Sequence, residues 1–331
     1  MNQRISIIVP TYNAKAYVKE AVASLCAQTY DNIEIIVVDD GSTDGTAELL
    51  RDIQLTDKRI KVVYKENEGV TKTRLRGVQE ASGEWVGFMD ADDTVESNMY
   101  ETLLYNAEKS GADISHCGYL KVFADRTVPY YDTKKRVVQD NEQGLYDLLK
   151  GDFVEPGLWN KLYKRTLFDE ILQGRIIDTT VKINEDLLMN YYLFKRSAKS
   201  IFEDKCLYRY FCRENSASTQ AINVHKLCDP LKVRKILYIE TLGNKRLNGV
   251  MRDNVLMRLI QLATRKISAL PDWAAEYIRQ ARKELKEFYK IVKKQPMSKK
   301  TKWNVRLAIC SPALYRIVHR VIVRKVKYET R

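Results

Sequence analysis

The sequence lacks any apolar run long enough to cross a membrane. A transmembrane helix needs about 18–20 consecutive apolar residues, and no run in the 331-residue chain reaches that length. The N-terminal segment MNQRISIIVPTYN has too short an apolar run, and too early a proline, for a secretory signal peptide. We therefore expect a protein that stays in the cytoplasm.

The sequence also offers few nitrogen and sulfur ligands for a metal. Its six cysteines show no C-x-x-C motif and no paired spacing, which favours reduced thiols in a cytosolic protein. The three histidines, His116, His225 and His319, lie far apart, and each is interpreted as a packing or surface residue. These absences argue against a disulfide framework and against a zinc site.

Net positive charge is confined to one end of the chain. The net charge is +13, but residues 279–331 carry 17 Lys and Arg against three Glu, a net +14, so the rest of the chain sums to −1. A nucleic-acid-binding domain would carry basic residues over its folded body and would show a binding motif. We therefore expect no nucleic-acid partner.

Strand and helix signals alternate along residues 1–95. Fully apolar runs, such as residues 5–9 in RISIIVP, are typical of strands buried on both faces of a parallel sheet. Stretches with apolar residues at helical spacing separate these runs. This order predicts an α/β fold with a doubly wound, mostly parallel sheet flanked by helices. A helix-prone stretch over residues 226–294 predicts a C-terminal helical extension.

The stretch FMDADDTVE, residues 88–96, gathers Asp90, Asp92 and Asp93 directly after an apolar strand. Carboxylates this close repel one another and are costly to remove from water. Three interpretations are open: the acidic first turn of a helix, a solvated turn, or oxygen ligands for a hard divalent cation.

Polar residues also follow two other predicted strands, at residues 10–13 and at Asp39 and Asp40. Because ligands of doubly wound sheets bind beyond the carboxyl ends of the strands, we expect these clusters and the acidic stretch to share one site. Neither a G-x-G-x-x-G fingerprint nor a Walker-type phosphate loop is present. A nucleotide would instead stack on Tyr12, hydrogen-bond to Asp40, and have its diphosphate held through a metal.

Four segments, in order, resemble the family 2 inverting glycosyltransferases of the GT-A fold, of the type that builds bacterial polysaccharides and surface glycans. They are SIIVPTYNAKAYVKEAVASLCAQTYDNIEIIVVDDGSTDGT, GVTKTRLRGVQEASGEWVGFMDADD, GLWNKLYKR and NEDLLMNYYLF. The resemblance covers roughly residues 4–215, and the ordered set is far more specific than any one segment. It implies inverting transfer of a hexosyl or N-acetylhexosaminyl group from a nucleotide sugar, we expect a UDP-sugar, with Mn²⁺ or Mg²⁺ as cofactor.

The resemblance also implies roles for residues at the donor site. The residues similar to the family's nucleotide-binding positions are Pro10, Thr11, Tyr12, Asn13, Asp40, Arg74, Asp90 and Ala91. Asp92, the second acid of the D-x-D pair, matches the metal-binding position. Arg74 lies in Thr73-Arg74-Leu75 where the family often has Ala-Arg-Asn, so only the arginine carries over.

At the acceptor side, Asp186 in NEDLL matches the family's general base, while Trp159, Lys161 and Glu185 match positions that face the acceptor. The residues alone allow plainer interpretations: NEDLL as a capped helix start with acids in its first turn, and Trp159 as a core aromatic. The family often has glycine where this chain has Asn184, a residue that tolerates positive φ better than most.

The tail sequence CSPALYRIVHRVIVRKVKY predicts an amphipathic helix that begins after Ser311, with Pro312 in its first turn. An apolar stripe with basic residues around it is typical of a helix lying on an anionic membrane surface; the stripe is Leu314, Ile317, Val318, Val321 and Ile322. The alternative is a basic helix packed on the protein. We therefore expect a peripheral protein on the inner face of the cell membrane.

The predicted organisation has three parts. Residues 1–220 form the glycosyltransferase domain, with a nucleotide-binding half (1–95) and an acceptor half (96–220); residues 221–294 form a helical region, and residues 295–331 the membrane-associating tail. The expected acceptor is a growing lipid-linked or cell-surface glycan. Two other functions stay open: a sugar-phosphate nucleotidylyltransferase, and a peripheral membrane module that only binds nucleotide.

Overall fold

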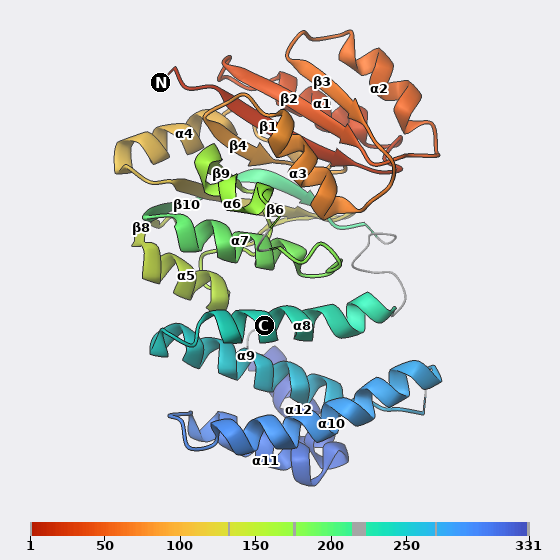
Figure 1. The fold of residues 1–331 in the computed structure, drawn as a ribbon, viewed down its shortest axis with the longest axis vertical. Coiled ribbons are helices and arrows are strands. Elements are labelled where there is room, and N and C mark those ends of the chain that lie inside the picture. Colours follow the sequence, from red (N-terminus) through yellow and green to blue (C-terminus); the bar gives the residue numbers. More distant parts are fainter. Residues whose placement is uncertain (1, 132, 175–176, 214–222, 269, 330–331) are drawn as a thin grey trace. The chain divides into compact units, whose positions relative to one another are not determined.

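The computed structural model describes residues 2–329 apart from residues 132, 175–176, 214–222 and 269, with only the backbone of residues 321–329. The chain divides into two compact units, residues 1–221 and 222–331. Figure 1 shows that the first unit is a sheet flanked by helices and that the second consists of helices. The predicted α/β fold with a C-terminal helical extension is confirmed.

A single sheet forms the centre of the first unit, in the order β3-β2-β1-β4-β9-β6-β10-β5, with β7 paired to β6 and β8 to β10. Strands β1 to β4 run parallel. Beyond β4 the directions are mixed, because β9 runs antiparallel to both β4 and β6. The strands are β1 (Ile5–Thr11), β2 (Ile33–Asp39), β3 (Ile60–Tyr64), β4 (Trp85–Phe88), β5 (Thr94–Val95), β6 (Ile114–Val122), β7 (Thr127–Pro129), β8 (Arg136–Asp140), β9 (Lys161–Lys164) and β10 (Lys199–Phe211).

Helices cover both faces of this sheet, as a doubly wound fold requires. Ile7 and Val9 of β1 share a core with α1 and α4, whereas Ile8 points to the opposite face, towards α3. There, a side chain at Gly77 would place its Cβ 2.3 Å from Ile8, so only glycine lets α3 lie this close. The helices of the unit are α1 (Val18–Cys26), α2 (Thr46–Gln54), α3 (Val70–Glu80), α4 (Met99–Ser110), α5 (Asn141–Lys150), η1 (Arg165–Phe168), α6 (Asp169–Leu172) and α7 (Glu185–Arg196).

The second unit has its own hydrophobic core. Its helices are α8 (Val224–Glu240), α9 (Lys245–Ala263), α10 (Asp272–Val292), α11 (Lys299–Cys310) and α12 (Pro312–Glu329). Val305 and Ala308 of α11 and Tyr315 of α12 are buried in that core. The packing therefore runs on past the boundary expected near residue 295, and the start of the predicted tail is part of the helical unit.

The predicted start of the amphipathic tail helix is present. α12 begins at Pro312, and the Ser311 hydroxyl accepts a hydrogen bond from the Leu314 backbone N–H. Leu314 and Ile317 of the predicted stripe are exposed; the side chains of Val321 and Ile322 lie outside the described residues. Within the described ranges, no helix combines the length and the apolar composition needed to span a bilayer.

Candidate active site

The carboxyl ends of β1, β2 and β4 open onto one cleft. Its first part is a cavity of about 250 Å³ lined by Pro10, Thr11, Tyr12, Asp40, Asn67, Gly69, Val70 and Thr73. Its second part, about 410 Å³, is lined by Pro10, Tyr12, Asn13, Ala14, Tyr17, Val70, Asp90, Ala91, Asp92 and Arg213. The shared walls join the two cavities, so the residues expected to bind the nucleotide, apart from Arg74, all line this cleft.

Asp40 lines the first cavity and is held by three hydrogen-bond donors. Its Oδ1 accepts from Lys65 Nζ at 2.6 Å and from the Glu68 N–H at 3.0 Å, and its Oδ2 accepts from the Gly69 N–H at 2.9 Å. Burial opposes ionisation, but these donors outweigh it and lower the pKa of Asp40 below its ordinary value. A fixed carboxylate facing a cavity can accept a hydrogen bond from a base or a ribose hydroxyl.

Tyr12 and Asn13 play different parts at the mouth of the cleft. The Tyr12 side chain is 52% exposed, which leaves a ring face open for stacking. Asn13 has a φ of +48°; its backbone N–H donates to the Ser42 hydroxyl and its side-chain oxygen accepts from the Thr43 N–H. The structure thus gives Asn13 the role of fixing the two loops that frame the cleft.

The three carboxylates of the acidic stretch after β4 have different surroundings: one is buried against β10, and two line the cavity. Asp93 is buried and accepts from the Tyr208 hydroxyl at 2.8 Å and the Phe211 N–H at 2.9 Å, both on β10. Burial, followed by the charges of Asp90 and Asp92, raises the pKa of Asp93 to about 8. Asp93 therefore anchors the stretch, whereas Asp90 and Asp92 face the cavity.

Asp92 is paired with a residue that the sequence analysis did not single out. Arg213, just after β10, donates from Nη1 to Asp92 Oδ2 at 3.0 Å, and its guanidinium lies 4.1 Å from the ring centre of Tyr17. Burial and then the charge of Asp90 raise the pKa of Asp92, while Arg213 opposes the rise. No local motif marks Arg213, because its partner lies 121 positions earlier.

The acid pair suits a divalent cation only if the ligand set is completed from outside the protein. Among the described residues, no group of three or more His, Cys, Asp and Glu side chains is placed to hold a metal. Asp90 and Asp92 provide carboxylate oxygens, and their negative charges repel each other. This repulsion, together with burial, raises the pKa of Asp92. Mg²⁺ commonly takes one or two carboxylates and completes its octahedron with water and substrate phosphates, so these residues fit a metal that arrives with a diphosphate.

Arg74 on α3 links the acidic stretch after β4 to the first turn of α7. Its Nη2 lies 3.3 Å from Asp90 Oδ1, and its Nη1 lies 3.2 Å from Glu185 Oε1. The side chain is buried, and its Nε has no hydrogen-bond partner among the described residues. Burial alone would lower the pKa of Arg74, but the carboxylates around it raise it. Arg74 therefore stays charged and draws the two carboxylates together from behind the cleft.

Glu185 and Asp186 occupy the first turn of α7, as the plainer interpretation of NEDLL also predicts. Asn184 precedes them with a φ of +67°, a conformation that asparagine adopts more readily than most residues. Burial and then the charge of Asp186 raise the pKa of Glu185 to about 7, and burial also raises the pKa of Asp186. The two carboxyls thus form a pair that can gain or lose a proton near neutral pH.

Lys161 does not face an acceptor in this structure. It is fully buried, and its ammonium donates to Glu155 O at 2.7 Å, Gly157 O at 2.5 Å and Asn160 Oδ1 at 2.7 Å. An ammonium has three protons to donate, so no donor is left, and burial lowers its pKa to about 7. The expectation of an acceptor contact is corrected: Lys161 holds the loop before β9.

The same loop carries Trp159 and is tied to α7. The Trp159 ring packs against Tyr208 and Tyr210, with ring centres 4.4 Å and 5.9 Å apart, and is partly buried against the core. Asn190, one turn after Asp186, donates to the carbonyl oxygens of residues 156 and 157. The sequence analysis missed Asn190, which couples the loop to the helix that carries the carboxyl pair.

Comparison with known proteins agrees with this geometry. The model of Glycosyl transferase family 2 matches residues 6–172, half of the chain. The uncharacterized glycosyltransferase EpsJ of Bacillus subtilis (strain 168) is 35% identical over 222 residues, which is 66% of this chain and 63% of EpsJ. The glycosyltransferase GlyA of Streptococcus pneumoniae serotype 4 is 32% identical over 244 residues, which is 71% of this chain and 34% of GlyA.

The fold has a close counterpart among solved structures. The crystal structure of S. aureus TarS 1–349 in complex with UDP-GlcNAc matches with a TM-score of 0.70 at 19% identity, over 97% of this chain and 92% of that chain. The first unit thus has the GT-A fold, and the chain belongs to glycosyl transferase family 2. It spans 63% of the length of EpsJ and about a third of GlyA.

Proposed function

We propose that the protein is a metal-dependent inverting glycosyltransferase that moves a sugar from a nucleotide sugar to a glycan. The observation that carries the proposal is the Arg74 bridge, which holds Asp90 of the D-x-D pair and Glu185 of the carboxyl pair within 3.3 Å of one guanidinium. One guanidinium thus connects an acid that lines the cleft, Asp90, to the carboxyl next to the candidate proton acceptor, Asp186.

Each group has one task in the proposed reaction. Asp186 takes the proton of the acceptor hydroxyl, whose oxygen forms a bond to the anomeric carbon while the bond to the diphosphate oxygen breaks on the opposite face. In-line attack inverts the anomeric centre. Asp92 together with Asp90 would hold a Mn²⁺ or Mg²⁺, which would supply positive charge for the leaving diphosphate.

The proposed donor is a UDP-sugar carrying a hexose or an N-acetylhexosamine. The similar TarS structure is a complex with UDP-GlcNAc, and in this chain the cavity around Asp40 and the open face of Tyr12 suit a nucleoside. Asp40 would accept from the base and Tyr12 would stack on it. Lys65, already 2.6 Å from Asp40, keeps that carboxylate ionised.

The proposed acceptor is a lipid-linked or cell-surface glycan, reached from the inner face of the membrane. Support comes from α12, where Leu314 and Ile317 are exposed next to the basic residues Arg316 and Arg320. Apolar side chains insert at the interface while basic ones attract anionic lipid. A peripheral enzyme held there would meet acceptors that cannot leave the bilayer.

A donor-hydrolysis screen tests the function directly. Nucleotide sugars are incubated with the full chain and Mn²⁺, and released nucleotide diphosphate is measured, with Asp186→Asn as the matched control. We expect release from at least one UDP-sugar, reduced in the variant. UDP binding without turnover of any sugar, even with glycan acceptors added, would contradict the proposal and favour a nucleotide-binding module. Release of pyrophosphate from a nucleoside triphosphate and a sugar phosphate would instead favour a nucleotidylyltransferase.

A further inference from the structure

The second unit contains a cavity of its own, lined by α9, the two residues after it, and α12. Its volume is about 340 Å³, within the range of about 300–1,000 Å³ typical of small-molecule sites. Its polar walls are strongly basic and include no carboxylate; they are Arg258, Gln261, Thr264, Arg265, Tyr315, Arg316, His319 and Arg320.

Arg258 is a partly buried cation of this cavity. Its Nη2 donates to the carbonyl oxygens of Lys226 and Leu227 at 3.1 Å and 3.0 Å, and its Nε is buried without a hydrogen-bond partner in the described part of the chain. Burial, followed by the like charges of Arg234 and Arg265, lowers its pKa. A buried donor without a partner, among cations, is costly for a folded protein.

The other cations leave donors available to a ligand. Arg316 donates from Nη1 to the Thr264 carbonyl oxygen at 2.8 Å. This hydrogen bond orients its guanidinium, and the other nitrogens can still donate. Arg265 and Arg320 make no side-chain hydrogen bond or ion pair with the residues that the structure describes. His319 stacks on Tyr315, with ring centres 5.6 Å apart. Since Tyr315 is buried in the core of the second unit, this contact holds the His319 ring beside the cavity.

We infer that this cavity binds a phosphate group, as a phosphate ester or as the free ion. Guanidinium groups match the geometry of phosphate oxygens with paired N–H donors, and an anion would offset the repulsion among the four arginines. The inference does not rest on the proposed sugar transfer. It uses residues that play no part in the donor cleft.

The phosphate could come from a lipid headgroup or from a soluble compound, and both share this chemistry. Vesicles separate the two sources. Phosphatidylcholine vesicles containing phosphatidic acid present a phosphate monoester, and vesicles with an equal negative charge from phosphatidylserine control for surface charge alone.

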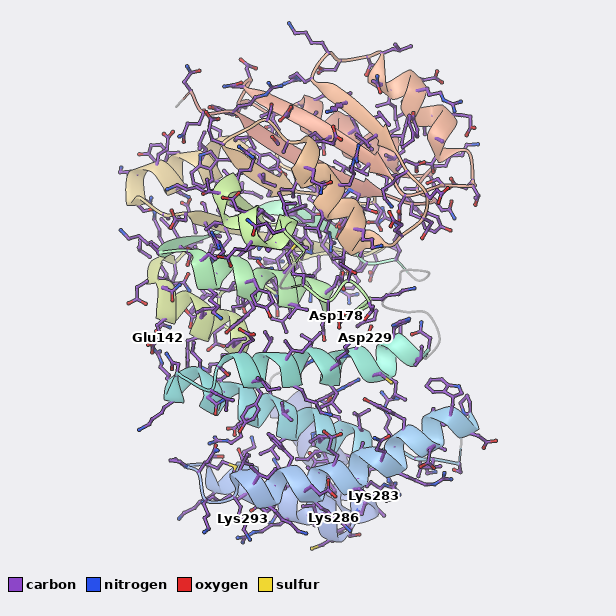
Figure 2. The ribbon with its side chains drawn as sticks, in the orientation of Figure 1. Glu142, Asp178, Asp229, Lys283, Lys286 and Lys293 are labelled. Carbon is purple, nitrogen blue, oxygen red and sulfur yellow. The ribbon has the colours of Figure 1, made fainter. Side chains whose placement is uncertain are left out.

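The test compares two double variants of the full chain that remove the same charge. Arg265→Gln/Arg320→Gln removes two cations of the cavity whose side chains make no hydrogen bond or ion pair with the described residues. Lys286→Gln/Lys293→Gln removes two exposed cations of α10 and the residue after it, which Figure 2 labels. Binding of inorganic phosphate is measured by calorimetry in EDTA, which removes any metal-held phosphate at the acid pair, and thermal unfolding checks the fold.

We expect the unmodified chain to bind phosphate saturably. The affinity should fall roughly tenfold or more in the cavity variant and should stay unchanged in the α10 variant. Absence of saturable binding by the unmodified chain, or an equal loss in both variants, would overturn the inference. If the cavity variant unfolds at a lower temperature than the unmodified chain, Arg320→Gln alone is used. Unchanged phosphate affinity in Arg320→Gln, with binding abolished by Lys286→Gln/Lys293→Gln, would also overturn the inference. Competition by phosphatidic acid but not by phosphatidylserine assigns the phosphate to a lipid; phosphate binding without such competition assigns it to a soluble ester.

Discussion

Arg74 and Glu185 form a buried ion pair between residues 111 positions apart, with 3.2 Å between Nη1 and Oε1. The pair joins α3, which packs on the parallel half of the sheet, to the first turn of α7. The same guanidinium also contacts Asp90. A displacement of Asp90 would therefore change the position of Arg74 and its contact with Glu185. One side chain thus contacts both the acid pair after β4 and the carboxyl pair of α7.

Replacing Arg74 should damage both stability and turnover. Arg74→Met leaves Glu185 and Asp90 without their shared cation, and breaking a buried pair in this way costs about 3–5 kcal/mol. Arg74→Lys keeps the charge but cannot reach both carboxylates with two prongs, so we expect a smaller loss of stability with turnover still reduced. Urea unfolding and steady-state kinetics measure the two effects.

Arg76→Met is the matched control for Arg74. Arg76 lies on the same helix, pairs with Glu80 and is 49% exposed, so its loss should change stability by less than about 1 kcal/mol. Equal effects of the two substitutions would show that the buried bridge has no special role.

Asp186→Asn should abolish transfer while leaving the donor site intact. The amide keeps the shape of the carboxyl but cannot take a proton, and loss of a general base typically costs about 10²–10⁴-fold in kcat. The affinity for UDP should change less than about twofold, because Asp186 lines neither of the two cavities. Single-turnover assays and calorimetry make the comparison, and near-normal turnover would assign the base role to another group.

The pH dependence of kcat should report the carboxyl pair. The pKa of Glu185 is raised to about 7, so below that pH the pair holds a proton and the base is partly blocked. We expect kcat to rise between pH 6 and 8, with an apparent pKa that belongs to the pair. Glu185→Gln removes one negative charge beside Asp186, so the rising limb should move to lower pH. If the rising limb stays at the same pH in Glu185→Gln, the charge of Glu185 does not influence the group that controls kcat.

The same shift has a consequence for stability, in the opposite direction. A carboxyl whose folded-state pKa lies above the usual 4.5 binds its proton more tightly in the folded protein. Its contribution to the free energy of unfolding is therefore complete below about pH 4.5 and is lost as pH rises through about 7. Activity and this part of stability change in opposite directions over one pH interval.

The meeting of the residues at the ends of β1, β2 and β4 in one cleft could be predicted from local patterns because they follow strands. Apolar runs fix β1, β2 and β4, parallel strands bring their ends to one edge, and the residues after each strand must then meet. Arg213, Asn190 and the role of Asp93 could not be predicted, because each depends on a partner more than 30 positions away. The family resemblance places Lys161 at the acceptor side, and no sequence pattern reveals that carbonyl oxygens of its own loop surround its ammonium.

Nucleotide binding should require a divalent cation and Asp92. In Mn²⁺ we expect UDP affinity at least tenfold higher than in EDTA, since the diphosphate would otherwise meet the uncompensated carboxylates of Asp90 and Asp92. Asp92→Asn should remove most of that difference, whereas Asp125→Asn, which changes an acid that is 71% exposed, should not. Equal UDP affinity with and without the metal would exclude the metal from donor binding.

Membrane association should depend on the exposed apolar residues of α12. Leu314→Asn/Ile317→Asn should weaken binding to anionic vesicles without changing thermal unfolding, because both side chains are exposed. Ile239→Asn/Leu242→Asn alters two equally exposed apolar residues near the end of α8 and serves as the control. Co-sedimentation at low and high salt gives the measurement, and identical behaviour of both variants would leave α12 as a packed helix only.

Truncation is the wrong way to test the same point. Removing the chain after Gln295 would take away Val305, Ala308 and Tyr315, which fill the core of the second unit. The sequence predicted the amphipathic stripe of the tail helix but not this packing, since the buried positions of α11 are too few to give a clear period. Loss of vesicle binding by a truncated chain would therefore not distinguish a missing membrane contact from an unfolded unit.

The anchoring of Asp93 has a further consequence for synthesis of the protein on the ribosome. Its two hydrogen-bond donors, Tyr208 and Phe211, are added 115 and 118 positions after it. At about 5–20 residues per second, the emerging chain carries the acidic stretch for roughly 6–24 s before those donors exist. A ribosome that stalls before residue 208 therefore displays Asp90, Asp92 and Asp93 before the strand that anchors Asp93 has been made.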